Sequence, residues 1–267
     1  MTGVKHSSRI LTRAIVRPPS PNFADGLTTA GLGAPIYGLA LKQHAAYCAA
    51  LEDCGLTVTY LDADLAYPDS TFVEDTAVLI ENAAMLMRPG APSRLGEVRS
   101  ISEALRNLLP ASNIQTIQLP GTVDGGDICE AGDHFFIGIS ERSNQAGAEQ
   151  LAAWLASSGF TSSSIDIREE TSLLHLKSGL AYLGENRLVV TEALAQREEF
   201  GANDHIRVSS AEEYGANCVR INDYVLIPSG CVKLEDSLQQ LGYRTIALEM
   251  SEFQKMDGGL SCLSLRF

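Results

Sequence analysis

The chain has 267 residues, of which 45% are hydrophobic and 20% are charged, an ordinary composition for a globular protein of one large or two small domains. Its formal net charge of −13 and its scattered Lys and Arg residues argue against a nucleic-acid surface and fit a small cationic substrate, although an acidic balance also serves solubility alone. No apolar run is long enough to span a membrane, and the N-terminus lacks the apolar centre of a signal peptide, so we predict a soluble cytoplasmic protein.

Five units of similar pattern follow one another, each with an apolar strand, a polar or glycine-containing loop and an amphipathic helix. The strands are predicted at 10–17, 84–88, 134–139, 187–191 and 224–228. Helices are predicted over 37–54, over 98–109 and over 233–241, and a further helix is predicted to end at Leu155. The unit that begins with the strand at 187–191 is shorter than the others. This alternation predicts an α/β fold of stacked copies of one supersecondary unit. Five units around an axis would direct their loops at one shared centre.

A long loop over residues 18–36 separates the first predicted strand from its helix and is rich in proline and glycine. Loops of this length are uncommon unless they are disordered or functional, so we interpret this one as an active-site lid. Leu27 and Leu32 would be unusual in a solvated loop, which favours the lid over a passive excursion.

Two acidic stretches lie beside apolar segments. Asp69, Glu74 and Asp75 place three carboxylates within seven residues. Buried without partners they would be costly, so they predict a clamp for a cation such as guanidinium, with a solvated edge as the alternative. In the stretch 124–127, Asp-Gly-Gly-Asp, the glycines let the backbone approach a ligand, although a hairpin turn is equally compatible.

Six cysteines show no C-x-x-C pair and no His-rich spacing, which argues against a zinc site and a disulfide framework. Most should be inert buried thiols, but Cys262 follows the pair Gly258-Gly259 and could meet a substrate. His175 lies in an apolar run, where a single histidine is usually a core residue. If His175, a carboxylate and Cys262 converge, the thiolate would be a nucleophile and the imidazole its proton partner.

Arg94 and Arg142 each follow a strand at the same place in their units. Five-unit symmetry would point both inward, where together they would form a receptor for a carboxylate. Two solvated loop arginines are the alternative.

Six spaced motifs together resemble those of the dimethylarginine dimethylaminohydrolase family, most closely its compact bacterial form. They are Phe72-Val-Glu-Asp75, Arg88-Pro-Gly-Ala-Pro-Ser-Arg94-x-Gly-Glu97, Asp124-Gly-Gly-Asp127, Arg142-x-Asn144, Leu174-His-Leu-Lys177 and Asp257-Gly-Gly-x-Ser-Cys262. The match runs in order through nearly the whole chain.

The resemblance implies the pentein fold, a five-bladed α/β propeller of ββαβ units, as a single catalytic domain over residues 1–267. It also implies hydrolysis of N-omega-methylated arginine to citrulline and a methylamine through a covalent cysteine intermediate, with no cofactor and no metal. It leaves both a monomer and a homodimer open.

The resemblance also implies roles for ten residues. Cys262 would be the nucleophile, His175 the acid and base, and Asp124 the carboxylate that orients the histidine. The substrate-binding residues would be Asp75 at the guanidinium with Glu74 in support, Asp69 at the amino end, Arg94 and Arg142 at the α-carboxylate, Leu27 in the lid, and the carbonyl of Asp257. The lid departs from the family pattern at Ile36, where an acidic residue is expected.

Four alternatives remain open from the sequence. An arginine deiminase or an amidinotransferase has the same fold, but both are usually longer than this chain. A non-catalytic pentein that binds a partner would not need Cys262, His175 and Asp124 together. A metal-dependent guanidine hydrolase would need a His/Asp ligand cluster, and the sequence offers none at recognisable spacing.

Overall fold

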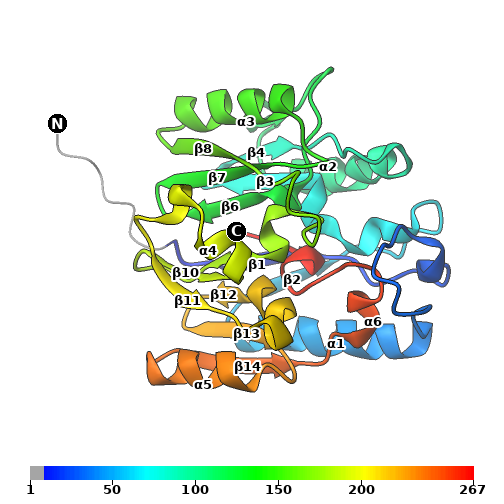
Figure 1. Cartoon of the computed structure of the whole chain (residues 1–267). Helices are drawn as coiled ribbons and strands as arrows, with labels where there is room; N and C mark the ends of the chain where they lie inside the picture. The colour runs from blue at the N-terminus through cyan, green and yellow to red at the C-terminus, as the bar shows by residue number, and fades with distance from the viewer. Residues whose placement is uncertain (1–8) are drawn as a thin grey trace.

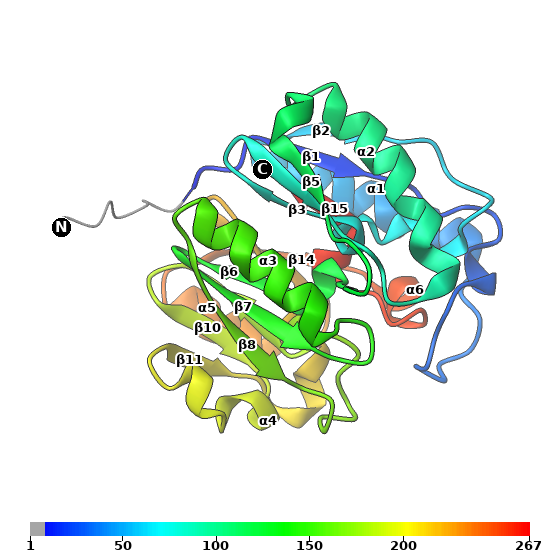
Figure 2. The same cartoon turned by 90° about the horizontal axis from the view of Figure 1, so that it is seen from above.

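The computed structural model describes residues 9–267. Within them, fifteen strands form five three-stranded sheets around a central axis, and the main helices lie on the outer side of the ring (Figures 1 and 2). Residues 1–8 of the predicted domain lie outside the described part. None of the helices in residues 9–267 is long and apolar enough to cross a membrane.

Every sheet has the same internal order. Its inner strand pairs antiparallel with a central strand, and the central strand pairs parallel with an outer strand that follows a helix. The sheets are β3 (Ala77–Ile80), β4 (Ala83–Leu86) and β5 (Ile114–Thr116); β6 (Ile128–Ala131), β7 (His134–Ile139) and β8 (Thr161–Asp166); β9 (Leu180–Tyr182), β10 (Arg187–Val190) and β11 (Asp204–Arg207); β12 (Val219–Ile221), β13 (Tyr224–Pro228) and β14 (Arg244–Leu248); and β15 (Ser264–Arg266), β1 (Arg13–Val16) and β2 (Thr57–Tyr60).

The two ends of the chain close the ring. The C-terminal strand β15 pairs antiparallel with β1, with Ala14 opposite Arg266 and Val16 opposite Ser264. The first unit therefore takes its inner strand from the last residues of the chain, and Cys262 lies two residues before that strand.

The helices connect the central and outer strands. They are α1 (Tyr37–Asp53), α2 (Val98–Arg106), α3 (Gln145–Ser157), α4 (Glu192–Ala195) and α5 (Val232–Gln240), with a further short helix α6 (Ser251–Gln254) before the C-terminal turn. In α3, Leu151, Trp154 and Leu155 are buried and pack against the apolar residues of β7, as the helical spacing of apolar residues requires. The same cluster includes Met85 and Met87 from the neighbouring β3–β5 unit, so the core is shared between adjacent units.

The predicted five-unit α/β arrangement is confirmed, and the strands predicted at 134–139 and 224–228 have the bounds of β7 and β13. Other bounds were wrong by a few residues: β1 begins at Arg13 rather than at Ile10, and α2 ends at Arg106 rather than at Leu109. The inner strands were not predicted as separate elements.

Candidate active site

Four short 3-10 turns bring the predicted site residues together, because each turn lies directly before an inner strand. Their ranges are Val73–Thr76, Gly125–Asp127, Leu176–Ser178 and Ser261–Leu263, which precede β3, β6, β9 and β15. All inner strands face the same axis, so the turns converge at one end of it. Sequence positions separated by up to 187 residues meet there, as Glu74 and Ser261 do.

The glycines of the Asp-Gly-Gly-Asp stretch allow this close approach. A Cβ on Gly125 would clash with the carbonyl oxygen of Glu74, and one on Gly126 would lie 2.9 Å from the ring of His175. The main-chain N–H of Gly126 donates to Asp75 Oδ1 at 2.8 Å. Gly125 and Gly126 therefore allow two acidic turns to pack against the histidine. The hairpin-turn alternative is wrong, because residues 125–127 form a 3-10 turn.

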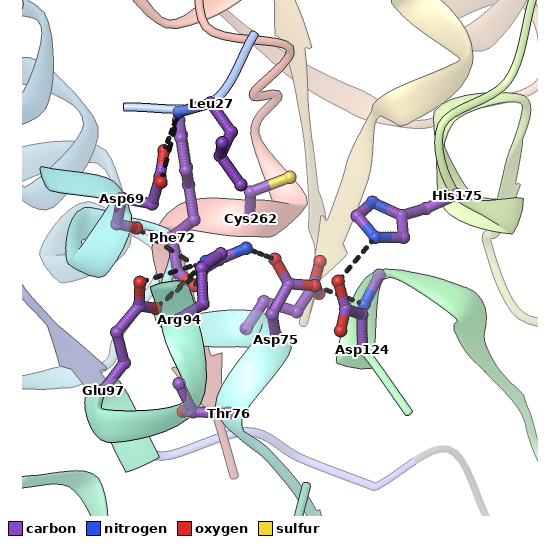
Figure 3. Close-up of polar contacts among 12 residues, drawn as sticks. Leu27, Asp69, Phe72, Asp75, Thr76, Arg94, Glu97, Asp124, His175 and Cys262 are labelled. Carbon is purple, nitrogen blue, oxygen red and sulfur yellow. Dashed lines mark hydrogen bonds and ion pairs between the residues drawn. The ribbon is translucent and has the colours of Figure 1, made fainter. Parts of the chain in front are cut away.

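His175 and Asp124 form the contact expected of an imidazole and its orienting carboxylate. Nε2 of His175 lies 3.0 Å from Oδ2 of Asp124, and both residues are buried (Figure 3). Burial alone would lower the pKa of His175, but Asp75, Asp127 and Asp124 outweigh it and raise this pKa to about 9. The histidine is therefore held as an imidazolium at neutral pH.

Asp127 has a different task from Asp124. Its carboxylate accepts hydrogen bonds from the main-chain N–H of Leu176 at 2.9 Å and from the hydroxyls of Ser140 and Ser143 at 2.6 Å each. It thereby fixes the turn that begins after His175.

Cys262 lies in the 3-10 turn before β15, partly exposed, and Figure 3 shows its sulfur directed toward the side of the site that carries His175. Its Sγ accepts a weak hydrogen bond from the N–H of Gly259 at 3.4 Å. Burial raises the pKa of the Cys262 thiol to about 12, and the negative charges of Glu74 and Asp75 add to this effect. Without a ligand the sulfur is therefore a neutral thiol beside a protonated imidazole.

Asp75 and Arg94 form a buried ion pair. Arg94 Nη1 donates to Asp75 Oδ2 at 2.6 Å, and Nε and Nη2 bind the carboxylate of Glu97 at 2.8–3.2 Å. Nη2 also donates to the carbonyl of Phe72 at 3.1 Å. Arg94 thus points inward as predicted, but its guanidinium is occupied by protein acceptors.

Glu74 points away from Asp75. Its carboxylate lies 2.5 Å from Nζ of Lys177 and 3.0 Å from Nη2 of Arg266, and it accepts from the hydroxyl of Ser261 at 2.7 Å. Its support for the site is therefore exerted through the turn that carries Cys262.

The lid residues contact the side chains of Asp69, a predicted substrate-binding carboxylate, and of Asp257, whose carbonyl was predicted to bind substrate. The main-chain N–H of Leu27 donates to both oxygens of Asp69, at 3.0 and 3.2 Å, and the N–H of Thr29 donates to Asp257 Oδ2 at 2.5 Å. Leu27 and Leu32 are 42% and 54% exposed, so these apolar side chains are not part of the protein core. At the end of the lid, the main-chain N–H of Ile36 donates to the carboxylate of Glu252, and the Ile36 side chain is exposed.

Arg142 is half-buried near this end of the site. Burial raises the pKa of Asp69, and the charges of Arg94 and Arg142, with the N–H of Leu27, oppose that rise. Since Arg94 is held by protein acceptors, Asp69 and Arg142 are the two groups of opposite charge here that could face the two charges of an amino-acid head group.

A small cavity of about 60 Å³ adjoins Cys262 and is lined by His175, Tyr214 and Asn217. A second cavity of about 650 Å³ extends from the lid residue Thr29 to Tyr214 and Asp257, and Cys262 does not line it. Asp75, Asp124 and His175 offer ligand atoms within 4.8 Å of one another, the only such group among residues 9–267. The oxygens of Asp75 and Asp124 already accept from Arg94, Gly126 and Gly90, so this group is a hydrogen-bond network.

Sequence reasoning missed Asn217, Ser261 and Glu97. The amide of Asn217 binds Ser261 and Lys177, and Glu97 holds Arg94. Glu97 was detectable, since it lies three residues after Arg94 and opposite charges at this spacing meet on a helical turn. Ser261 lies in the motif that carries Cys262 but is uncharged and was given no role, and Asn217 lies in no charged or glycine-rich motif.

The family model described as eukaryotic N,N dimethylarginine dimethylhydrolase matches residues 34–218. The N(G),N(G)-dimethylarginine dimethylaminohydrolase of Pseudomonas aeruginosa is 42% identical over 95% of this chain and 98% of its own length, and that of Streptomyces coelicolor is 33% identical over 95% and 96%.

Solved structures give the same result. A mutant of the Pseudomonas aeruginosa enzyme complexed with citrulline superposes with a TM-score of 0.94 at 40% identity, covering 97% of this chain and 100% of that one. The N-terminal domain of the cyanobacterial arginine dihydrolase ArgZ, at 19% identity and a TM-score of 0.86 over 97% of each chain, shares the pentein fold. The chain therefore belongs to the dimethylarginine dimethylaminohydrolase family and has the pentein fold.

Proposed function

We propose that the chain hydrolyses N-omega-methylated L-arginine to L-citrulline and a methylamine, with Cys262 as nucleophile and a covalent thiouronium intermediate. The contact between His175 and Asp124, in a site that also contains a partly exposed thiol, is the observation that carries this function. The relatives named for this reaction cover nearly the whole chain, and one family structure is an adduct with S-methyl-L-thiocitrulline.

Substrate binding begins with charge. The guanidinium enters beside Asp75, whose carboxylate then exchanges part of its bond to Arg94 for bonds to the substrate. Asp69 receives the α-ammonium, and Arg94 and Arg142 receive the α-carboxylate. The carbonyl of Asp257 completes the pocket.

The first chemical step forms a carbon–sulfur bond. The substrate's positive charge offsets Glu74 and Asp75, which otherwise raise the pKa of Cys262, and so favours the thiolate. The thiolate attacks the guanidinium carbon, and the proton held by His175 passes to the leaving nitrogen as the carbon–nitrogen bond breaks. Methylamine or dimethylamine departs, and a thiouronium remains on Cys262.

The second step breaks the carbon–sulfur bond. Water attacks the thiouronium carbon and gives a proton to the now neutral His175, whose ring is oriented by Asp124. Citrulline forms as the sulfur leaves as thiolate, and the second proton of the attacking water is released to solvent. Citrulline is neutral at its reacting end, so it loses its attraction to Asp75 and dissociates. The reaction needs no cofactor.

Residues 18–36 serve as the lid of this site in a single catalytic domain. The support is that Leu27 and Thr29 bind Asp69 and Asp257, so lid position and substrate-binding side chains are linked. Closure would bring Leu27 over the bound substrate.

A homodimer in the cytoplasm completes the proposal. Ile36, Tyr37 and Leu39 expose apolar surface around the start of α1 that a second copy could cover, and all six cysteines are free, as in a reducing compartment. Sedimentation of the full chain tests the assembly: a mass of a single chain at micromolar concentration would contradict the dimer.

Citrulline release from asymmetric dimethylarginine and from arginine, at matched concentrations, tests the function. Turnover of the methylated substrate that is lost in Cys262→Ser and unaffected by a chelator supports it. Faster turnover of arginine would indicate an arginine deiminase, and loss of activity with chelator would indicate a metal-dependent hydrolase. Citrulline from neither substrate would contradict the proposal.

A further inference from the structure

The fourth unit of the ring contributes a polar residue at the same place as its neighbours. Asn217 ends the 3-10 segment Ser210–Asn217 and lies two residues before the inner strand β12. Asp75 lies two residues before β3, and Cys262 lies two residues before β15. The pseudo-fivefold arrangement therefore directs Asn217 at the same centre as the proposed nucleophile and the guanidinium-binding carboxylate.

The side-chain amide of Asn217 joins two of the converging turns. Nδ2 donates to the carbonyl of Lys177 at 2.7 Å and to Oγ of Ser261 at 2.9 Å, while Oδ1 accepts from the N–H of Ser261 at 3.0 Å. A main-chain carbonyl can only accept and a main-chain N–H can only donate, so these partners fix which way the amide points. Asn217 is 6% exposed, and water does not compete strongly for these bonds.

Each of the two turns carries one reacting group. Lys177 is two residues after His175, and Ser261 directly precedes Cys262. The amide is thus a short bridge between the main chain that holds the imidazole and the main chain that holds the thiol.

The surroundings are built around this bridge. A Cβ on Gly259 would clash with Oδ1 of Asn217, so the glycine is what lets the C-terminal loop approach the amide. The hydroxyl of Ser261, which accepts from Asn217, donates in turn to Glu74 at 2.7 Å. Three of the converging turns are therefore linked through one asparagine and one serine.

We propose that Asn217 is a positioning residue that holds Cys262 at reacting distance from His175. This inference rests on the proposed function. The hydrogen bonds of Asn217 go to Lys177 and Ser261 and not to Asp69, Asp75, Arg94 or Arg142, so it would act on the chemical step rather than on the binding of the amino-acid head group.

The size of the effect follows from the demands of proton transfer and nucleophilic attack. A displacement of about 1 Å between reacting groups costs about 100-fold in rate. We expect Asn217→Ala to lower kcat for dimethylarginine about 100-fold, while KM changes less than about threefold because the head-group contacts remain.

Asn222 offers a matched control in the same unit. Its Nδ2 donates to the carbonyls of Leu11 and Cys54 at 2.9 and 3.0 Å, and its Oδ1 accepts from the N–H of Leu11 at 2.9 Å. It therefore joins distant segments with three hydrogen bonds of similar length, but it touches neither reacting turn. Asn222→Ala should lower the melting temperature, and its kcat should stay within about twofold of the wild type.

A second readout does not depend on turnover. The rate at which iodoacetamide alkylates Cys262 is followed by mass spectrometry of the peptide at several pH values, well below the melting temperature. Release of the turn should expose the thiol and let it ionise at lower pH, so Asn217→Ala should be alkylated faster than wild type although it turns over more slowly. Asn222→Ala should react like the wild type.

Asn217→Asp keeps the size and the acceptor for Ser261 but loses the donor to Lys177, and it serves if the alanine variant does not fold. It should behave like Asn217→Ala. Unchanged kcat and alkylation in a folded Asn217 variant would overturn the inference, as would an equal loss of kcat in Asn222→Ala. If the wild type releases no citrulline, the proposed function fails. The alkylation profiles still decide whether Asn217 positions Cys262.

Discussion

Nε2 of His175 lies 3.0 Å from Oδ2 of Asp124, and the charges of two further carboxylates, Asp75 and Asp127, act on the same ring. Burial would favour the neutral imidazole, yet the three carboxylates raise the pKa of His175 from 6.5 to about 9. The proton needed by the leaving amine is therefore already present at neutral pH.

Replacing Asp124 by Asn removes one of the charges that raise the pKa of His175, and it removes the acceptor that orients the imidazole ring. We expect kcat for dimethylarginine to fall about 100- to 1,000-fold, a range typical of lost general acid–base catalysis. In the wild type, kcat/KM should rise with pH up to about 9, because the reacting thiolate–imidazolium pair carries one proton fewer than the free thiol and imidazolium, and it should level off once free His175 loses its proton. In Asp124→Asn this rise should end at lower pH. Steady-state pH profiles measure both effects.

Asp236→Asn is the control, because Asp236 is exposed on α5 and far from the site. Its profile should match the wild type. If kcat/KM of Asp124→Asn changes over the same pH range as that of the wild type, Asp124 does not influence the proton on His175.

A cationic ligand should ionise Cys262. Burial, Glu74 and Asp75 raise the pKa of this thiol to about 12, and a guanidinium ion beside Asp75 would offset the two charges. Thiolate absorbance near 240 nm, taken as the difference between wild type and Cys262→Ser, should stay small between pH 6 and 9 without ligand. Millimolar guanidinium should increase it in that range, because the cation lowers the thiol pKa. Sodium chloride at the same ionic strength is the control, and an equal increase with both salts would contradict the prediction.

The central strands could be predicted because they are four to six residues long and mostly apolar. The inner strands β9, β12 and β15 have three residues each, too few to show a period, and Ser264 and Arg266 give β15 a polar appearance. β9 and β12 pair with the strands that follow them in the chain, whereas β15 pairs with β1 from the other end of the chain.

The candidate site divides in the same way. Asp124, His175 and Cys262 lie in motifs with glycines or charges, which carry a local signal. Asn217 has no such signal, since its importance depends on Lys177 and Ser261 arriving from other units. Arg94 was predicted to point inward, but the sequence did not indicate that Asp75 would occupy its guanidinium.

The buried pair of Asp75 and Arg94 should contribute to stability as well as to binding. Asp75→Asn leaves Arg94 partly unpaired in a site where both side chains are 5% exposed, so we expect the free energy of unfolding to fall by about 3 kcal/mol. Glu103→Gln breaks an ion pair on the surface, in which Glu103 is 64% and Arg99 is 87% exposed. This variant should change the free energy of unfolding by less than about 0.5 kcal/mol. Urea unfolding at pH 7 measures both.

The pH dependence of that difference has a definite sign. Burial would raise the pKa of Asp75, but Arg94 and His175 outweigh it and lower this pKa from 3.8 to about 2. A carboxyl with a depressed pKa stabilises the fold above its ordinary pKa, and this contribution is lost as pH falls toward 2. The gap in unfolding free energy between wild type and Asp75→Asn should therefore shrink between pH 4 and pH 2. A constant gap would show that the charge of Asp75 is not what stabilises the fold.

The lid should set substrate affinity through Gly26. A Cβ at this position would clash with Oδ1 of Asp69, the carboxylate that accepts the N–H of Leu27. Gly26→Ala should therefore displace Asp69 and raise KM for dimethylarginine about tenfold, which corresponds to losing one charge-assisted hydrogen bond worth about 1.4 kcal/mol. Since Cys262 and His175 are untouched, kcat should change less. Initial rates over a range of substrate concentrations separate the two constants.

Gly38→Ala is the matched control, because a Cβ there meets no atom within 4 Å and Gly38 lies in the first turn of α1. Alanine should keep KM and slightly raise the melting temperature, since glycine is the weaker helix former. If Gly26→Ala keeps the wild-type KM, the link between the lid and Asp69 does not govern binding. A fall in kcat with unchanged KM would instead place the effect of the lid on the chemical step, where exclusion of water around the thiouronium becomes the deciding factor.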